Sequence, residues 1–349
     1  MRKKDTTILA IGDPPDYDSF RKFDKERKYI LEQGFNYKAV DYEELFNAED
    51  LGISTGKVIV FLFFPFYYWN RNIEHRGYRG IYGNLSFCRK FSRFSEDLIA
   101  RIESVLPGKD LFFINDPRVS SLYRDKLLAQ EALSGSGINV PQRIDTRSVR
   151  VVKNLLGDGR KMYIKPRYGS MGKGITFLEK DNWQTNFRFR ENRIANIRSD
   201  QGWKFHGITG NTGFLKSLLC KDVIIEEAVE LFNLKGFKVD FRVYCFLDKV
   251  LYIYPRKNNI DSVTTNISQG GKGDPKLLRV MPRKIISKIN RQSLKTMKVL
   301  KLNFAGIDIA IDSNMENIYV LDVNMFPGFP KRRTFKLARS MVSGLRMLE

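Results

Sequence analysis

The arrangement of apolar segments changes along this 349-residue chain, and the change limits the folds that it can adopt. Up to residue 115, apolar runs of strand length, such as residues 8–11 and 58–64, alternate with segments of helix length. This alternation predicts a parallel sheet with helical crossovers. Beyond residue 160 the apolar runs are joined by short turns, which predicts antiparallel sheets. We therefore expect an α/β (α+β) fold with three domains, at residues 1–115, 116–222 and 223–349.

The middle of the chain contains one clear helix signal and one segment without a pattern. Asp116 can cap a helix and Pro117 suits its first position, so we expect a helix that ends near residue 134, before Gly135. Residues 181–222 show little periodicity and are rich in Arg, Asn and Gly. We expect that segment to be an insertion in the second domain.

The charge balance is far from neutral, since 60 Lys and Arg against 39 Asp and Glu give a net charge of +21. Such a field attracts nucleotides, nucleic acids, acidic polymers and anionic membranes, and charge alone does not choose among them. The 3 cysteines are too far apart for a disulfide framework or a CxxC metal site, which suits a cytoplasmic protein. The apolar run at residues 58–69 is shorter than the ~20 residues that cross a bilayer, and we expect no signal peptide.

Carboxylates on a predicted hairpin provide the sharpest chemical signal. If residues 313–317 form a five-residue turn, Asp308 lies directly opposite Asp322, and strand alternation places Asn324 on the same face. Two opposed carboxylates destabilise a hairpin, and a divalent cation removes that cost. Two carboxylates and an amide oxygen are hard ligands suited to Mg²⁺ shared with phosphates. The alternative interpretation is a solvated hairpin face.

A glycine-rich turn joins two further predicted strands. Gly169, Gly172 and Gly174 allow backbone N–H groups to approach phosphate oxygens, and Lys165 on the preceding strand can reach the same anion. The turn is not a P-loop, because GxxxxGK[ST] is absent, and it joins two strands where a dinucleotide-binding turn would open a helix. A hairpin needs glycine in any case, so the glycines alone do not establish a phosphate site.

Arg242 and Arg256 fall on or beside predicted strands, where their fork geometry could hold a carboxylate or a phosphate. Each could equally be a surface cation. The order of all these pieces resembles the ATP-grasp superfamily: an α/β domain, a helix lysine, a strand lysine, a glycine-rich lid, an acidic hinge strand, a basic strand and a carboxylate–carboxylate–Asn site before Pro-Gly.

Within the superfamily the chain is most similar to the YheC/YheD endospore-coat-associated branch and the RimK-like ligases. The residues that carry this resemblance are Glu230-Leu231, Lys235-Gly236, residues 239–243 and residues 266–271. The resemblance spans about residues 115–330. It implies an ATP-grasp fold, in which an N-terminal parallel α/β domain is followed by two α+β subdomains that clamp ATP.

The resemblance also implies a role for particular residues. It places the ATP phosphates at Lys126 and Lys165, under a lid formed by Gly169, Ser170, Gly172 and Gly174. It places the adenine at the backbones of Glu227 and Val229, with Glu226 as a further cofactor-binding residue, and the ribose at Asp240, with Glu230 as the other candidate. It places Mg²⁺, with Mn²⁺ as an alternative, at Asp308, Asp322 and Asn324. It places the transferring phosphoryl group and the acceptor at Arg242, Arg256, Asn266, Gly270 and Gly271.

The chain departs from the family pattern at two places. Asp322 stands where Glu is usual, which puts the metal distance and the number of metal ions in question. Ten residues separate Val229 from Asp240, which leaves the ribose contact open between Asp240 and Glu230.

Three functions are compatible with these features. The first is a ligase in which ATP phosphorylates a carboxylate and an amine attacks the acyl phosphate. The second is a kinase for a phosphorylated small molecule, because residues 322–329 also resemble the ATP-grasp inositol phosphate kinases. The third is a basic polyanion-binding protein with a vestigial ATP site, although no nucleic-acid-binding motif is present.

The basic segments favour an acidic substrate. Residues 275–301 hold nine Lys or Arg and no acidic residue, and five more cations follow in residues 331–339. The alternative interpretation of residues 275–301 is an amphipathic helix whose cationic face is exposed to solvent. We expect a small-molecule or peptide substrate of acidic character, and neither a nucleic acid nor a membrane as a partner.

Overall fold

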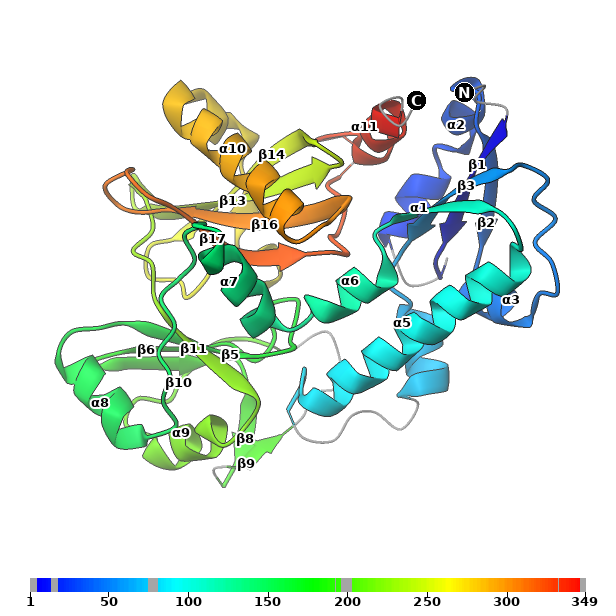
Figure 1. Cartoon of the computed structure of the whole chain (residues 1–349). Coiled ribbons are helices and arrows are strands. Elements are labelled where there is room, and N and C mark those ends of the chain that lie inside the picture. The colour runs from blue at the N-terminus through cyan, green and yellow to red at the C-terminus, as the bar shows by residue number, and fades with distance from the viewer. Residues whose placement is uncertain are drawn as a thin grey trace.

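The computed structural model describes residues 5–13, 18–74, 81–191, 193–195, 203–331 and 333–345. Across these residues, a four-stranded parallel sheet is combined with five-stranded and six-stranded antiparallel sheets (Figure 1). The two antiparallel sheets lie one above the other on the left of the figure, and the parallel sheet lies to their right. The change in apolar spacing along the sequence therefore predicted the architecture correctly.

The N-terminal sheet has the strand order β2-β1-β3-β4, with all neighbouring strands parallel. All residues of β1 are buried, as expected for a strand covered by helices on both faces. The strands are β1 (Thr6–Ile11), β2 (Asn36–Val40), β3 (Lys57–Leu62) and β4 (Asp110–Ile114). The helices are α1 (Asp18–Asp24), α2 (Arg27–Glu32), α3 (Tyr42–Asn47), α4 (Phe66–Tyr68), its π-helical continuation η2 (Trp69–Ile73) and α5 (Leu85–Val105).

The second sheet has the order β10-β7-β6-β5-β11 and carries the glycine-rich turn between β5 and β6. Its elements are β5 (Met162–Pro166), β6 (Thr176–Glu179), β7 (Asn182–Thr185), β10 (His206–Gly207), β11 (Val223–Glu227), α8 (Val149–Gly157) and α9 (Thr212–Leu219). A separate hairpin joins β8 (Arg188–Arg190) to β9 (Arg193–Ala195). The segment 181–222, expected as an insertion, thus supplies β7, β10 and α9 to this unit. Its strands are too short to produce a visible period.

The third sheet has the order β15-β14-β13-β16-β17, with β12 beside β13. Its strands are β12 (Asn233–Leu234), β13 (Phe237–Phe246), β14 (Lys249–Asn259), β15 (Lys272–Gly273), β16 (Phe304–Ile311) and β17 (Ile318–Asn324). One-turn helices η3 (Ile267–Gln269) and η4 (Pro275–Arg279) precede the long helix α10 (Arg283–Val299). Helix α10 buries Ile285, Ile289 and Met297 against the sheet, as its spacing of apolar residues predicted.

The helix expected from residue 116 to about 134 is divided into α6 (Pro117–Leu122) and α7 (Lys126–Gly135). The division occurs because Asp125 caps α7 through the N–H of Leu127, at 3.0 Å, while both of its carboxylate oxygens also bind Arg167. The prediction of one continuous helix was therefore wrong. The break places Lys126 at the start of α7.

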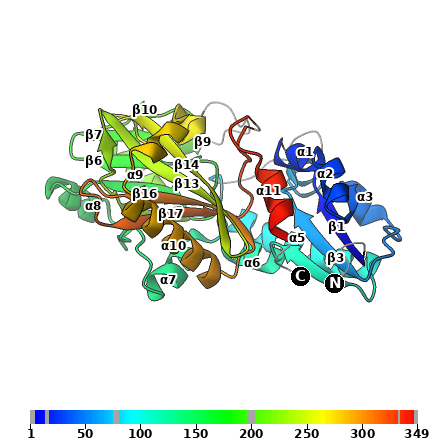
Figure 2. The same ribbon diagram turned by 90° about the horizontal axis from the view of Figure 1, so that it is seen from above.

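The C-terminal helix α11 (Leu337–Gly344) returns to the N-terminal sheet. Figure 2 shows it between the third sheet and helices α1 and α2, and its Leu337, Met341 and Val342 share a core with Ile8 and Phe61. The chain is thereby closed into one body, although the exact domain boundaries stay predictions. Within the described ranges, no helix is both long and apolar enough to cross a bilayer.

Candidate active site

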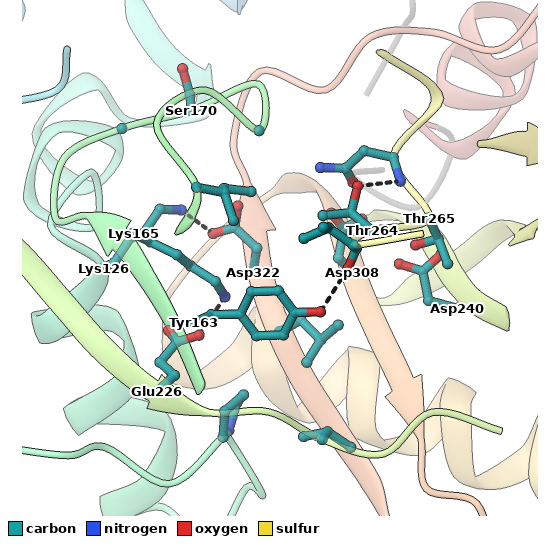
Figure 3. Close-up of a pocket in the computed structure, with 18 of the residues that line it drawn as sticks. Lys126, Tyr163, Lys165, Ser170, Glu226, Asp240, Thr264, Thr265, Asp308 and Asp322 are labelled. Carbon is teal, nitrogen blue, oxygen red and sulfur yellow. Dashed lines mark hydrogen bonds and ion pairs between the residues drawn. The ribbon is translucent and has the colours of Figure 1, made fainter. Parts of the chain in front are cut away.

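A cleft lies between the second and third sheets, beneath the glycine-rich turn (Figure 3). One wall comes from β5 and β11, and the other from β13, β14, β16 and β17. The predicted site residues that line it are Lys126, Lys165, Gly169, Ser170, Gly172, Glu226, Glu227, Val229, Asp240, Arg256, Asn266, Asp308 and Asp322. The predicted residues outside its lining are Gly174, Arg242, Gly270, Gly271 and Asn324.

Asp308 and Asp322 are register partners on β16 and β17, as the hairpin pattern predicted. The turn differs from the expected one, because Ile311 pairs with Ile318 and the loop therefore covers residues 312–317. A register shift next to Asp308 leaves Leu321 as the extra residue and restores the predicted pairing. Bulges of this kind re-aim side chains, and here Leu321 and Asp322 both line the cleft.

Each of the two carboxylates is neutralised by cations from other elements. Arg242 binds both oxygens of Asp308 at 2.8 Å, and Arg256 approaches Asp308 Oδ1 at 3.3 Å. Lys126 Nζ lies 2.6 Å from Asp322 Oδ1. Burial of Asp308 favours its neutral form, but the two guanidinium groups outweigh burial and lower its pKa to about 2.

The oxygen atoms around this pair are compatible with Mg²⁺. Asn324 donates its Nδ2 hydrogen to the carbonyl of Gly306 at 3.2 Å, which leaves its side-chain oxygen as the possible ligand atom. In the described part of the chain, no group of three His, Cys, Asp or Glu side chains is placed so that it could hold a metal ion. A metal at this position would therefore depend on Asp308, Asp322 and the amide, a set of hard oxygen donors that suits Mg²⁺.

Asp240 and Arg256 form a buried ion pair across β13 and β14, with side chains that are each 3% exposed. Burial disfavours the charged form of Arg256, but Asp240 and Asp308 outweigh it and raise its pKa. Any ribose contact of Asp240 would compete with this pair. Glu230, the other candidate for the ribose, is exposed and does not line the cleft.

The opposite wall carries a second buried pair. Lys165 Nζ and Gln130 Nε2 bind different oxygens of Glu226, whose side chain is 2% exposed. Arg160 binds both oxygens of Glu227 at 3.0 and 3.1 Å. The N–H of Glu227 donates to Gln142 O at 2.8 Å, so this N–H group is already used.

Two residues that the sequence did not single out hold parts of the cleft together. Tyr163 extends from β5 and donates its hydroxyl to Val263 O at 2.7 Å, which joins the two walls. Asn186 is 1% exposed and accepts from the N–H of Ile175 at 2.8 Å, while its Nδ2 donates to Gly172 O at 2.7 Å. Asn186 thus clamps the glycine-rich turn from a segment whose role the sequence left open.

The glycines shape the turns around the cleft. Gly172 has φ +67°, a backbone conformation that favours glycine, and a Cβ there would lie 2.7 Å from Nδ2 of Asn266, in the loop between β14 and η3. Gly270 ends η3 in the left-handed region at φ +92°, and a Cβ at Gly271 would overlap Thr265 O at 1.9 Å. The predicted pair Gly270-Gly271 therefore determines the path of the loop that carries Asn266.

The basic segments lie away from the cleft lining. The cations of α10 are on the opposite side of that helix from its buried apolar residues, which matches the amphipathic interpretation. Lys331, Arg333 and Lys336 are exposed, and Arg332 lies outside the described residues.

A family model for YheC/D-like ATP-grasp proteins matches residues 116–344. Because this match covers more than half of the chain, the chain belongs to that family, as its motifs predicted. Endospore coat-associated protein YheD of Bacillus subtilis is 25% identical over 207 residues, which cover 54% of this chain and 44% of that protein. A probable alpha-L-glutamate ligase of Syntrophotalea carbinolica is 24% identical over 221 residues, which cover 63% of this chain and 61% of that protein. The match thus spans about half of the length of these curated relatives.

Solved structures show the same fold over the whole chain. The ATP-grasp ligase PsnB complexed with its minimal precursor aligns with a TM-score of 0.59 at 17% identity, covering 99% of this chain and 100% of that chain. PsnB complexed with a phosphomimetic precursor variant, Mg and ADP aligns with a TM-score of 0.56 at 16% identity, covering 97% and 96% of the two chains. The protein therefore has the ATP-grasp fold that its sequence predicted.

Proposed function

We propose that this protein is an ATP- and Mg²⁺-dependent ligase that joins a carboxylate to an amine through an acyl phosphate. The observation that carries the proposal is the pairing of Asp308 with Asp322 in one wall of a cleft that the glycine-rich turn covers. Membership of the YheC/D-like ATP-grasp family supports the same reaction class.

The side chains of the cleft fit the parts of such a site. Lys126 and Lys165 would contact the ATP phosphates, and Asp308, Asp322 and Asn324 would hold Mg²⁺, or Mn²⁺ in its place. Bound Mg²⁺ would supply positive charge to the phosphate oxygens. Lys126 pairs with Asp322 in this structure, and its ammonium group would turn to the phosphates once Asp322 has another partner.

The reaction would need no covalent nucleophile on the protein. The cations of the cleft would stabilise charge that develops on the transferring phosphoryl group, and Arg256 lies close to Asp308 where that charge would arise. The walls would align the substrate carboxylate with the terminal phosphate, and the lid would exclude water from the acyl phosphate. An incoming amine would then displace phosphate to form the amide.

We further propose that the substrate is an acidic small molecule or peptide in the cytoplasm. Three features support this substrate class: the net charge of +21, a relative described as an alpha-L-glutamate ligase, and a structural neighbour whose complexes contain a precursor.

The test is a measurement of ADP and free phosphate released from ATP, with pools of amino acids, acidic peptides and phosphorylated metabolites. A ligase releases both products when a carboxylate and an amine are present together, and we expect this result. Release of ADP without free phosphate would identify the alternative, a kinase. Absence of nucleotide turnover with every pool would contradict both enzymes and favour the polyanion-binding function.

A further inference from the structure

Arg124 is a cation in an apolar environment at the junction of the N-terminal domain and the glycine-rich turn. Its guanidinium carbon lies over the rings of Phe64, Phe87 and Phe91, at 5.6, 4.8 and 5.4 Å from their centroids. Its Nε atom is buried and has no hydrogen-bond partner in the structure. Burial lowers the pKa of Arg124 through the loss of hydration, and the nearby Asp322 and a hydrogen bond with Tyr82 offset only part of this effect.

The carboxylates near Arg124 are already used by other cations. Asp125, the next residue, gives both oxygens to Arg167 at 2.7 and 2.6 Å. Asp322 pairs with Lys126. Over the described ranges, no carboxylate forms an ion pair with Arg124.

A partly buried cation without an ion-pair partner is costly. Removing an ion from water is unfavourable, and contacts with aromatic faces offset only part of that cost. Groups with such an unfavourable environment are concentrated at functional sites, where a ligand supplies the missing charge. The environment of Arg124 is therefore suited to a bound anion.

The contacts of Arg124 indicate where that anion would lie. Its Nη2 donates to Ser170 Oγ at 3.3 Å, and Tyr82 shares the same hydroxyl at 2.8 Å. Ser170 belongs to the glycine-rich turn and lines the cleft. Lys126, two residues after Arg124, reaches Asp322 in the opposite wall. An anion held between the turn and Asp322 would thus be flanked by both cations.

We propose that Arg124 is an anion-binding residue of this site and that it binds the β- and γ-phosphates of the nucleotide beneath the glycine-rich turn. The inference rests on the proposed function, since it requires that the cleft binds ATP. The planar guanidinium group suits phosphate oxygens. Arg124 does not itself line the cleft, and Ser170, which does, lies between the two and would have to move aside for the contact.

The test is isothermal titration calorimetry of the full chain with Mg²⁺ and ATP, ADP or AMP. Arg124→Met should weaken ATP and ADP binding by about tenfold or more, and leave AMP binding within about twofold of wild type. Arg124→Lys keeps the positive charge but loses the planar guanidinium group that can donate two parallel hydrogen bonds, so the ATP affinity of this variant should fall by about threefold. The matched control is Arg118→Met, because the Arg118 side chain is 66% exposed and pairs only locally with Asp116.

Two results would overturn the inference: wild-type affinity for ATP in Arg124→Met, or an equal loss of ATP and AMP affinity, which would indicate a distorted site. If Arg124→Met does not fold, the same comparison of ATP affinity with AMP affinity in Arg124→Lys tests the inference. A wild-type protein that binds none of the three nucleotides would overturn the proposed function itself, and this inference with it.

Discussion

Asp308 and Asp322 face each other on adjacent strands, yet their charges are neutralised from different directions. Asp308 is bound by Arg242 and Arg256 within the third sheet, and Asp322 is bound by Lys126 from helix α7. The hairpin therefore tolerates two opposed carboxylates without a metal ion. Only the Asp322 pair reaches outside the third sheet, to helix α7, so Asp322 is the carboxylate whose partner can change most easily.

This difference predicts the effect of Asp322→Asn. ATP turnover should fall by at least about 100-fold, because a direct metal ligand contributes more than the 10–100-fold typical of outer-shell groups. The free energy of unfolding should change by no more than about 1 kcal/mol, since the Asp322 side chain is 33% exposed and its ion pair is partly hydrated. The measurements are ADP release and urea-induced unfolding.

The control for that variant is Glu131→Gln, which removes an exposed carboxylate paired with Arg143 at 2.8 Å. It should leave both turnover and stability unchanged. Turnover near the wild-type level in Asp322→Asn would exclude Asp322 from the site. A gain in stability would mean that repulsion from Asp308 persists despite the neighbouring cations.

The ion pair between Lys165 and Glu226 predicts that two variants with different free energies of unfolding have the same weakened ATP affinity. Lys165→Met leaves the buried Glu226 carboxylate with Gln130 as its recorded partner, and should lower the free energy of unfolding by about 3 kcal/mol. Adding Glu226→Gln removes the unpaired buried charge, so the double variant should recover most of the lost free energy of unfolding. ATP affinity should stay weaker by about 1–3 kcal/mol in both variants, because each lacks the ammonium group.

Denaturant unfolding and calorimetric ATP titration check these two quantities separately. Recovery of ATP affinity in the double variant would show that Lys165 acts only by neutralising Glu226. Failure of the double variant to recover stability would assign another structural role to the lysine.

The position of the hairpin carboxylates could be predicted because period-two alternation and turn residues define both strands. The predicted pairing of Asp308 with Asp322 is correct, although the turn is one residue longer than expected and the bulge at Leu321 compensates for it. A bulge of this kind leaves no mark in the sequence, since Leu321 follows the apolar pattern of its strand. The predicted register of Asp308 and Asp322 was therefore confirmed, whereas the longer turn and the bulge that produce this register were not predicted.

The long-range partners of the charged residues could not be predicted. Asp125 interrupts the expected helix because Arg167, 42 residues away, binds its carboxylate. The environment of Arg124 is assembled from α5, the end of β3 and the glycine-rich turn. Local propensity carries no information about such contacts, and only the Asp125-Lys126 capping signal could have indicated the break.

Asp308 should also make stability depend on acid pH. Its pKa is about 2 in the folded protein and about 3.9 in an unfolded chain, so the folded state holds fewer protons. The stabilisation of about 3 kcal/mol is fully present above about pH 5 and is lost progressively as the pH falls through about 2. Urea unfolding of wild type and Asp308→Asn should show a difference that shrinks over this range. A constant difference would mean that the arginines do not stabilise the ionised carboxylate.

The clamp at Asn186 gives the last prediction. Asn186→Asp keeps the size of the side chain and the acceptor for the N–H of Ile175, but places a carboxylate oxygen against Gly172 O in place of the amide donor. The glycine-rich turn should lose its fixed conformation, with a cost of about 1–3 kcal/mol from the unsatisfied buried group. ATP affinity should fall by about tenfold, because the turn must then be ordered by the nucleotide.

Calorimetric ATP titration and thermal unfolding measure the two effects, and Asn182→Asp serves as the matched control. Asn182 begins β7, which ends one residue before Asn186. It is exposed, and its side-chain oxygen accepts from Gln184 Nε2 at 3.0 Å. The same chemical change there should alter neither quantity. Unchanged ATP affinity in Asn186→Asp, together with a lower unfolding temperature, would show that the clamp stabilises β6 and β7 without shaping the turn. Equal ATP losses in both variants would instead point to the added negative charge, because charge is the one property that the two substitutions share.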